Sequence, residues 1–163
     1  MDFKKLTLRR EPEKGDLERV RDILLSTGKF HSHEIDVALE LVQDRLDKGA
    51  KSEYFFIFAE REGKVIGYVC YGPITMAEER FDIYWIAVHE EIQREGIGAF
   101  LIMETEKSIL EAGGRYIFVE TSSKEIYKPT RNFYIKQAYQ EVANIPDYYA
   151  DNDNKVVLRK RLN

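Results

Sequence analysis

Hydrophobic and polar residues follow two different periods along this chain, and the change between them outlines the fold. In the first third, apolar residues recur every three or four positions, which predicts helices over residues 16–28 and 33–48. Asp16 is expected to cap the first helix, and Gly28 is expected to end it. The acidic residues of the second helix lie opposite its apolar face and are expected to be solvated.

From residue 54 the pattern becomes that of strands. YFFIFAE (54–60) and VIGYVCYG (65–72) flank the turn REGK and predict a hairpin, followed by the strand FDIYWIAV (81–88). The other strands are expected at 3–10, 115–121, 139–145 and 155–162, and the other helices at 96–114 and 129–138. This order predicts an α+β fold with a mixed sheet. No repeat, linker or composition break divides residues 1–163, which favours a single domain.

Composition and charge exclude several classes of protein. Apolar residues make up 44% of the 163 residues, charged residues 33%, and the net charge is −4, with scattered basic residues that argue against nucleic acid as a partner. The amino-terminal segment lacks the apolar core of a signal peptide, and no run approaches membrane-spanning length. The single cysteine, Cys70, excludes an internal disulfide and is typical of a core residue in a reducing compartment. We therefore expect a cytoplasmic protein without a membrane partner.

Two glycines, Gly96 and Gly98, lie in HEEIQREGIGAFL, between a predicted strand and a predicted helix. A dinucleotide loop would explain them, and Glu120 ends the next strand about where a ribose-binding acid would lie. However, Leu101 occupies the third glycine position, and seven residues separate the strand from the first glycine. No GxxxxGK[ST] motif occurs either. Both nucleotide interpretations therefore fail.

Gly96 and Gly98 nevertheless remove two Cβ atoms at the start of a helix. Unpaired N–H groups and the positive end of the helix dipole attract anions to such a position. Arg94 adds a positive charge. A tight helix entry without a ligand is the alternative interpretation. If the loop binds a pyrophosphate, the residues that would hold it are Gln93, Arg94, Glu95, Gly96, Ile97, Gly98 and Ala99.

Two segments resemble motifs of the GCN5-related N-acetyltransferases. YWIAVHEEIQREGIGAFL matches the acetyl-CoA motif Q/R-x-x-G-x-G/A that follows an "IAV"-like strand, and FYIKQAY (133–139) is similar to F-Y-x-K-x-G-[FY], with Ala138 in the glycine place. The order of elements is also that of the family, so the resemblance covers nearly the whole chain. It implies the acyl-CoA N-acyltransferase fold, a mostly antiparallel seven-stranded sheet flanked by about four helices, with acetyl-CoA as co-substrate and no metal.

One departure concerns the last helix. Many members of the family carry an asparagine three residues before a small residue, whereas this chain has Tyr127 and Thr130 at those places. The contact that the asparagine makes is therefore in doubt. Arg131, on the same helix, is expected either to reach cofactor phosphate or to be solvated.

The resemblance also implies how acetyl transfer takes place. Strand 81–88 would splay from 115–121, and N–H groups near Ile86 and Val88 would bind the thioester arm and polarise its carbonyl, although an ordinary core strand is compatible with the same residues. Tyr134 falls at the place of the general acid that faces the leaving sulfur. A thiol titrates near pH 8.5 and a tyrosine near pH 10, so this proton transfer would be nearly balanced. A core tyrosine is the alternative.

Asp82 aligns with the strand position where some members carry a glutamate base. Burial could raise its pKa toward the range that a general base needs. The sequence is equally compatible with an exposed acid at the start of the strand. At pH 7, deprotonating a lysine-like amine costs roughly 4–5 kcal/mol and an α-amine roughly 1 kcal/mol. A weak base such as Asp82, or a water relay at Tyr84, therefore suits an α-amine better.

The acceptor pocket is expected between TGKFHSHE (27–34), which contains Phe30, and the loop NIPDYYADNDN (144–154). In that loop Asp147 and Tyr148 could contact an ammonium group, or could only anchor the loop. His31, His33 and Glu34 are too close together for a zinc site of usual spacing.

These observations predict an acetyl-CoA-dependent N-acetyltransferase. The preferred acceptor is the primary amine of a small amino-acid-like or amine metabolite. A protein amine, amino-terminal or lysine, is the alternative acceptor, and a non-catalytic acyl-CoA-binding module is the alternative class. Members of the family commonly form dimers, which leaves a homodimer open.

Overall fold

A computed structural model describes residues 6–163, and it confirms the predicted mixed sheet of seven strands and four helices. The strands are β1 (Leu6–Arg9), β2 (Phe55–Arg61), β3 (Lys64–Pro73), β4 (Arg80–Val88), β5 (Tyr116–Ser122), β6 (Gln140–Ala150) and β7 (Asp153–Arg161). The helices are α1 (Asp16–Ser26), α2 (Ser32–Lys48), α3 (Ile97–Glu111) and α4 (Lys128–Lys136), and short 3₁₀ turns are η2 (Gly49–Lys51), η3 (Glu90–Ile92) and η4 (Glu125–Tyr127). Residues 3–5 of the expected first strand lie outside the described residues.

The strand order is β1-β2-β3-β4-β5-β7-β6. β4 and β5 are parallel, whereas β1–β2, β2–β3, β5–β7 and β6–β7 are antiparallel. The chain forms two compact units: unit 1 is the chain up to Gly72 with Trp85–Thr105, and unit 2 is Pro73–Tyr84 with Glu106–Asn163. Among residues 6–163, no helix is both long and apolar enough to span a membrane.

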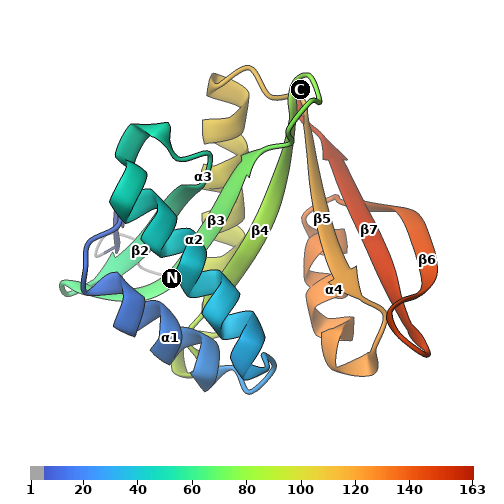
Figure 1. The fold of residues 1–163 in the computed structure, drawn as a ribbon, viewed down its shortest axis with the longest axis horizontal. Coiled ribbons are helices and arrows are strands. Elements are labelled where there is room, and N and C mark those ends of the chain that lie inside the picture. The colour runs from blue at the N-terminus through green and yellow to red at the C-terminus, as the bar shows by residue number, and fades with distance from the viewer. Residues whose placement is uncertain (1–5) are drawn as a thin grey trace. The chain divides into compact units, whose positions relative to one another are not determined.

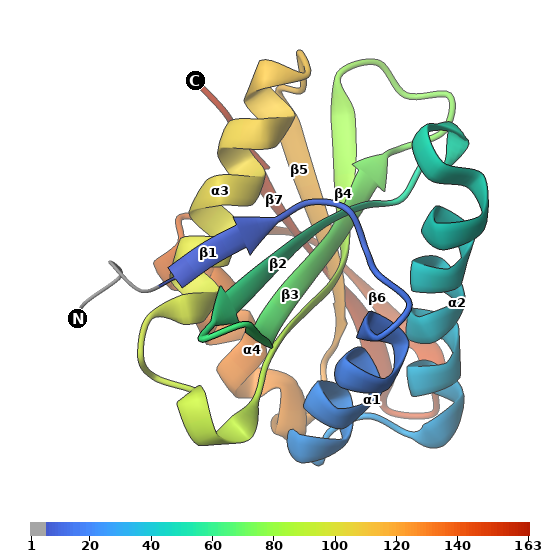
Figure 2. The same cartoon turned by 90° about the vertical axis from the view of Figure 1, so that its left-hand side faces the viewer.

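The core of unit 1 lies between α1, α2 and one face of β2 and β3 (Figure 1), and it includes Val20, Ile35 and Tyr68. Because side chains alternate along a strand, Gly67 faces the other way. A Cβ there would lie 3.1 Å from the carbonyl oxygen of Ala87 and 3.4 Å from Leu101 of α3. α3 therefore packs on the opposite face of β3, as Figure 2 shows.

The first helix does not start as the sequence suggests. Its N-cap is Gly15, and the expectation that Asp16 caps the helix is wrong. The carboxylate of Asp16 is nearly buried, accepts a hydrogen bond from the N–H of Glu13 at 2.7 Å, and pairs with the guanidinium of Arg9 at 2.7 and 2.9 Å. The partner from β1 decides this side chain's position. Gly28 follows the helix with φ +64°, as expected for a stop signal.

In unit 2, α4 lies alongside β5 and β7 and covers one face of these strands (Figure 1). Ile117, Val119 and Leu158 are buried on that face. A Cβ at Gly114 would lie 2.7 Å from the ring of Phe81, so only glycine fits there. The opposite face carries Asp82, Phe118, Glu120 and Lys155, and we call it the carboxylate face.

The predicted loop at 144–154 is mostly strand, which corrects that expectation. β6 continues to Ala150 and β7 begins at Asp153. Ile145 pairs with Lys155 and Ala150 with Asp153, so residues 146–149 bulge opposite a single residue of β7. Proline at position 146 has no N–H for the ladder, and Asp147 adopts φ +50°. The bulge turns this part of β6 out of the regular register.

Candidate active site

The loop before α3 has the geometry of an anion-binding turn. Arg94 has φ +71° and Gly96 has φ +83°, and the carbonyl of Gly96 accepts a hydrogen bond from the N–H of Phe100 at 3.0 Å. Because α3 begins at Ile97, its first N–H groups, including that of Gly98, have no acceptor within the helix. These backbone donors, with the exposed Arg94, fit the phosphates of a coenzyme.

Two predicted contacts of this loop have structural roles. The side-chain amide of Gln93 donates to the carbonyl of Val88 at 3.1 Å, and its backbone N–H donates to Glu90 at 3.2 Å. Glu95 pairs with Arg61 at 2.8 Å. These bonds hold the loop's shape, and the backbone N–H groups of Ile97, Gly98 and Ala99 at the start of α3 are candidate donors to an anion. Ile86 and Val88 are partly exposed near the end of β4.

Local contacts also account for the positions of Phe30, His31 and Glu34. The ring of Phe30 meets Trp85 edge-on at 5.2 Å and packs against the core of unit 1. His31 is the N-cap of α2, and the carboxylate of Glu34 accepts a hydrogen bond from its N–H at 2.7 Å. This capping box accounts for the HSHE stretch. No group of His, Cys, Asp and Glu in the described part of the chain could hold a metal ion.

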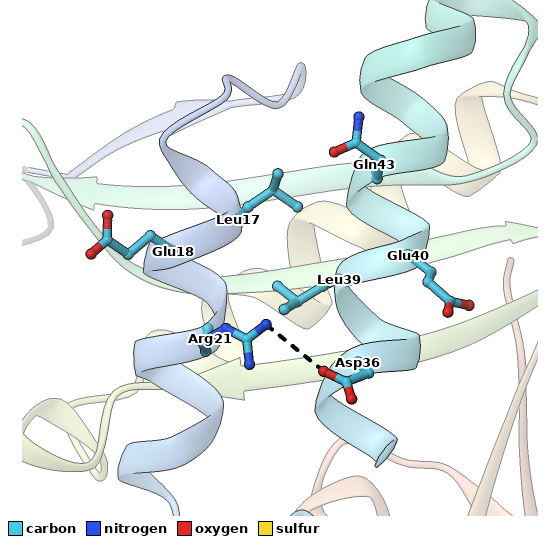
Figure 3. A pocket seen from close by; sticks show the side chains of 7 residues that line it. All are labelled: Leu17, Glu18, Arg21, Asp36, Leu39, Glu40 and Gln43. Carbon is cyan, nitrogen blue, oxygen red and sulfur yellow. Dashed lines mark ion pairs between the residues drawn. The ribbon is translucent and has the colours of Figure 1, made fainter. Parts of the chain in front are cut away.

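A shallow groove of about 530 Å³ lies between α1 and α2 (Figure 3). Leu17 and Leu39 lie between the two helices, and Arg21 and Asp36 face each other across it at 3.8 Å. This ion pair is half exposed and therefore weak. None of the predicted site residues lines the groove, so we do not assign the reaction to it.

Asp82 lies half-buried on the carboxylate face of unit 2. Burial is the main cause that raises its pKa to about 6; the carboxylate of Glu120 adds to the rise, and the ammonium of Lys155 opposes it. A carboxylate that titrates near pH 6 is mostly ionised at neutral pH and binds a proton more readily than an ordinary aspartate. Asp82 therefore has the properties of a weak general base.

Glu120 and Lys155 were not predicted as part of the acceptor site. Nζ of Lys155 lies 2.7 Å from the carboxylate of Glu120 and 4.4 Å from the centroid of the Tyr148 ring. Burial acts to lower the pKa of Lys155, but Glu120 and Tyr148 outweigh it and raise the pKa. Because side chains alternate along a strand, the segment IFVET predicts that Glu120 and the buried Val119 lie on different faces of the sheet. Nothing in the sequence, however, pairs Glu120 with Lys155.

Three other residues that are expected to bind the acceptor are Tyr84, Asp147 and Tyr148. Tyr84 and Tyr148 are partly exposed, with 38% and 54% of their surface accessible. One carboxylate oxygen of Asp147 accepts a hydrogen bond from the N–H of Asn152 at 2.7 Å, which stabilises the bulge of β6. That contact favours the interpretation of Asp147 as an anchor.

The pairing of β4 with β5 ends at Ile83 and Val119. β5 continues through Glu120 to Ser122, paired there with β7. Tyr84 and Glu120 therefore lie just beyond the end of the parallel ladder, and Asp82 lies just before it. Backbone groups at such an end are no longer bound to the neighbouring strand and can bind another partner.

Tyr134 is 2% exposed, and burial raises its pKa. Its ring meets the ring of Tyr139 edge-on at 5.3 Å, and its carbonyl accepts a hydrogen bond from the N–H of Tyr139 at 3.0 Å. Tyr139 in turn lies 5.6 Å from Nζ of Lys160, on the helix-covered face of the sheet. Ala138, with φ +65°, makes the turn that brings these tyrosines together. The raised pKa makes Tyr134 a weaker acid than the near-balanced donor expected from ordinary values.

Arg131 contacts the backbone of the segment that precedes its helix. Its Nη1 donates to the carbonyls of Ser122 and Lys124 at 2.6 and 3.0 Å. The guanidinium therefore holds the turn between β5 and η4, and its remaining donors are those that could reach a phosphate.

Comparison with known proteins agrees with this fold and these motifs. A sequence model of the Acetyltransferase (GNAT) family matches residues 17–139. An uncharacterized N-acetyltransferase of Methanocaldococcus jannaschii is 27% identical over 144 residues, which are 82% of this chain and 89% of the relative. An N-alpha-acetyltransferase of Sulfurisphaera tokodaii is 29% identical over 118 residues, 65% of this chain and 68% of the relative.

A solved structure is more similar still. The crystal structure of a GNAT-family protein from Desulfovibrio desulfuricans has a TM-score of 0.94 and 38% identity, and it covers 96% of this chain and 98% of its own. The fold is thus that of an acyltransferase. The chain belongs to the GNAT family and is an N-acetyltransferase.

Proposed function

We propose that the whole chain acts as one domain that transfers the acetyl group of acetyl-CoA to the primary amine of a small amino-acid-like or amine metabolite. The observation that carries the proposal is the end of the β4–β5 ladder at Ile83 and Val119. A carboxylate with a raised pKa, Asp82, lies on one face there, and the buried Tyr134 belongs to α4, which covers the other face of β5 and β7. An acid and a base are thus available on the two faces of the strands of unit 2.

Each residue has a defined part in the proposed reaction. Backbone N–H groups of Ile97, Gly98 and Ala99 hold the coenzyme phosphates, and backbone groups near Ile86 and Val88 hold the thioester arm. Asp82 accepts a proton from the amine, directly or through one water at Tyr84. The amine nitrogen then bonds to the carbonyl carbon.

As the C–S bond breaks, the leaving sulfur takes the proton of the Tyr134 hydroxyl. The second proton of the amine nitrogen then passes to the tyrosine oxygen, directly or through water, and Asp82 returns its proton to solvent. Because burial raises the pKa of this tyrosine, its hydroxyl stays protonated over the whole working range of pH. It is therefore always able to donate. The products are an N-acetyl amine and the free thiol of coenzyme A.

The strength of the base narrows the choice of acceptor. Proton transfer from an α-amine of pKa about 8 to a base of pKa about 6 costs about 3 kcal/mol, whereas a lysine-like amine of pKa about 10.4 costs about 6 kcal/mol. An α-amine is therefore the better acceptor. The amino-terminal amine of a protein meets this requirement too, and the N-alpha-acetyltransferase of Sulfurisphaera tokodaii favours it as the second candidate.

The test is thiol release from acetyl-CoA with a panel of amines, with product masses measured. The panel contains L- and D-amino acids, polyamines, aminoglycosides and short peptides. Turnover with amino acids or small amines, at rates above those with peptides, is the expected result. Turnover with peptides alone would establish the second candidate instead. If acetyl-CoA binds but no amine in the panel is acetylated, the proposed acceptor class is wrong.

A further inference from the structure

Lys155 connects three strands of unit 2. It lies on β7, its ammonium lies 2.7 Å from the carboxylate of Glu120 on β5, and it lies over the ring of Tyr148 on β6. The side chain of Lys155 is 12% exposed, whereas that of Glu120 is 49% exposed. The lysine is therefore the fixed member of the ion pair, and Glu120 is the member held by it.

Both members of this pair act on Asp82. The two carboxylates lie on adjacent parallel strands and on one face, because Asp82 pairs with Phe118 and Glu120 follows two residues later on β5. The carboxylate of Glu120 opposes ionisation of Asp82, and the ammonium of Lys155 favours it. Like charges at such a site keep one carboxylate protonated unless a cation lies beside them.

The other charged groups of unit 2 near this face have their own partners. Arg80 on β4 and Arg159 on β7 lie over the ring of Tyr116, at 4.6 and 5.2 Å. Asp147 on β6 binds a backbone N–H in the bulge. The shift at Asp82 comes from burial, Glu120 and Lys155, so Lys155 is the cation that balances the two carboxylates.

We propose that Lys155 is a positioning residue for deprotonation of the acceptor: it fixes the carboxylate of Glu120 and supplies the positive charge that lets Asp82 ionise beside it. The inference rests on the proposed function, in which Asp82 accepts the proton of the amine. Lys155 acts through Asp82 and does not touch the reacting atoms. A lysine that only stabilised the sheet would change unfolding but not the pH at which the base titrates.

The experiment compares the pH dependence of kcat/KM in four variants, between about pH 5 and pH 8. Lys155→Met removes the charge and keeps the apolar stem, Lys155→Arg keeps the charge, Glu120→Gln removes the opposing carboxylate, and E120Q/K155M removes both. In the wild type, kcat/KM is expected to rise with pH on the acid side of the profile, and the midpoint of this acid limb is expected near pH 6. Lys155→Met should move it by about half a pH unit or more toward alkaline pH, because the ionised form of Asp82 loses its cation. Glu120→Gln should move it toward acid pH, and the double variant should lie between the two.

Lys155→Arg should leave the limb in place, which separates charge from the particular side chain. If a folded Lys155→Met variant leaves the limb at the wild-type pH, Lys155 has no such role and the inference is overturned, whatever Glu120→Gln does. If Lys155→Met does not fold, as judged by its thermal transition, an unmoved limb in Glu120→Gln is sufficient to overturn it.

A second readout does not depend on activity. The titration of the Asp82 carboxyl carbon, followed by NMR in the wild type and in Lys155→Met, should show a higher midpoint in the variant. An unchanged midpoint would refute the inference even in an active enzyme. A raised midpoint in a chain that acetylates no amine would support the inference about Lys155 and refute the proposed function.

Discussion

Replacing Asp82 by asparagine should stabilise the protein at neutral pH and at the same time remove its base. The folded-state pKa of Asp82 is about 6, against an ordinary value of 3.8. The folded chain therefore keeps the proton to a higher pH than the unfolded chain does, and ionisation of Asp82 costs stability as the pH rises from about 4 to above 6. The difference corresponds to at most about 3 kcal/mol, at about 1.4 kcal/mol per pH unit. Because the side chain is only half-buried, solvent screening reduces this, and we expect a gain of about 1–2 kcal/mol.

The assay is urea unfolding of the wild type and of Asp82→Asn at pH 7.5 and at pH 5, conditions on either side of the folded-state pKa of about 6. The gain should be present at the higher pH and smaller at the lower one, where folded Asp82 is mostly protonated. Asp151→Asn, in the exposed turn between β6 and β7, is the matched control and should change stability by less than about 0.5 kcal/mol.

Two results would refute this reasoning. A gain equal at both pH values would mean that ionisation of Asp82 is not the source of the cost. A variant less stable than the wild type at pH 7.5 would mean that Asp82 makes favourable contacts that outweigh its burial. In turnover, Asp82→Asn should lose about 100-fold in kcat/KM, and a wild-type rate would assign deprotonation to a water relay instead.

Four further substitutions test the site and the turns around it. Tyr134→Phe should lower kcat by about 100-fold and leave the Kd for acetyl-CoA unchanged in calorimetry, because only the donor to sulfur is lost; equal turnover would remove Tyr134 from the mechanism. Gly96→Val should weaken acetyl-CoA binding at least tenfold, since φ +83° disfavours a β-branched residue, and a normal Kd in a folded variant would contradict the phosphate site. Ala138→Gly should raise the free energy of unfolding by about 0.5–1 kcal/mol, because φ +65° is strained for alanine, whereas Gly113→Ala, at φ +86°, should lower it by a similar amount. A loss of stability in Ala138→Gly would show that the turn before Tyr139 is not strained.

The order of strands and helices follows from the sequence because each element has a local cause. Apolar residues at helical spacing form α1 and α2, and Glu62 and Gly63, at φ +54° and +75°, make the tight turn of the β2–β3 hairpin. The glycine before α3 and the fit of FYIKQAY to a family motif are likewise properties of short segments. Chemistry that a single segment carries, such as an anion-binding loop, could therefore be predicted.

Where prediction failed, a partner on another strand decided the outcome. Asp16 has the sequence of a helix cap, but Arg9 of a neighbouring strand takes its carboxylate. The segment at 144–154 is rich in loop-forming residues, yet pairing with β7 extends β6 to Ala150. Propensity within a segment is worth less than the hydrogen bonds that a neighbouring strand supplies.

The sequence by itself determined the elements, their order, the glycine loop and the family. Tertiary structure alone decided which charges meet. Glu120 and Lys155 lie in separate strands, and only the antiparallel register of β5 with β7 brings them within 2.7 Å. The pKa of Asp82 depends on this register and on burial. Periodicity states which face a residue occupies, but electrostatic energy depends on distances across strands, and those exist only once the sheet has formed.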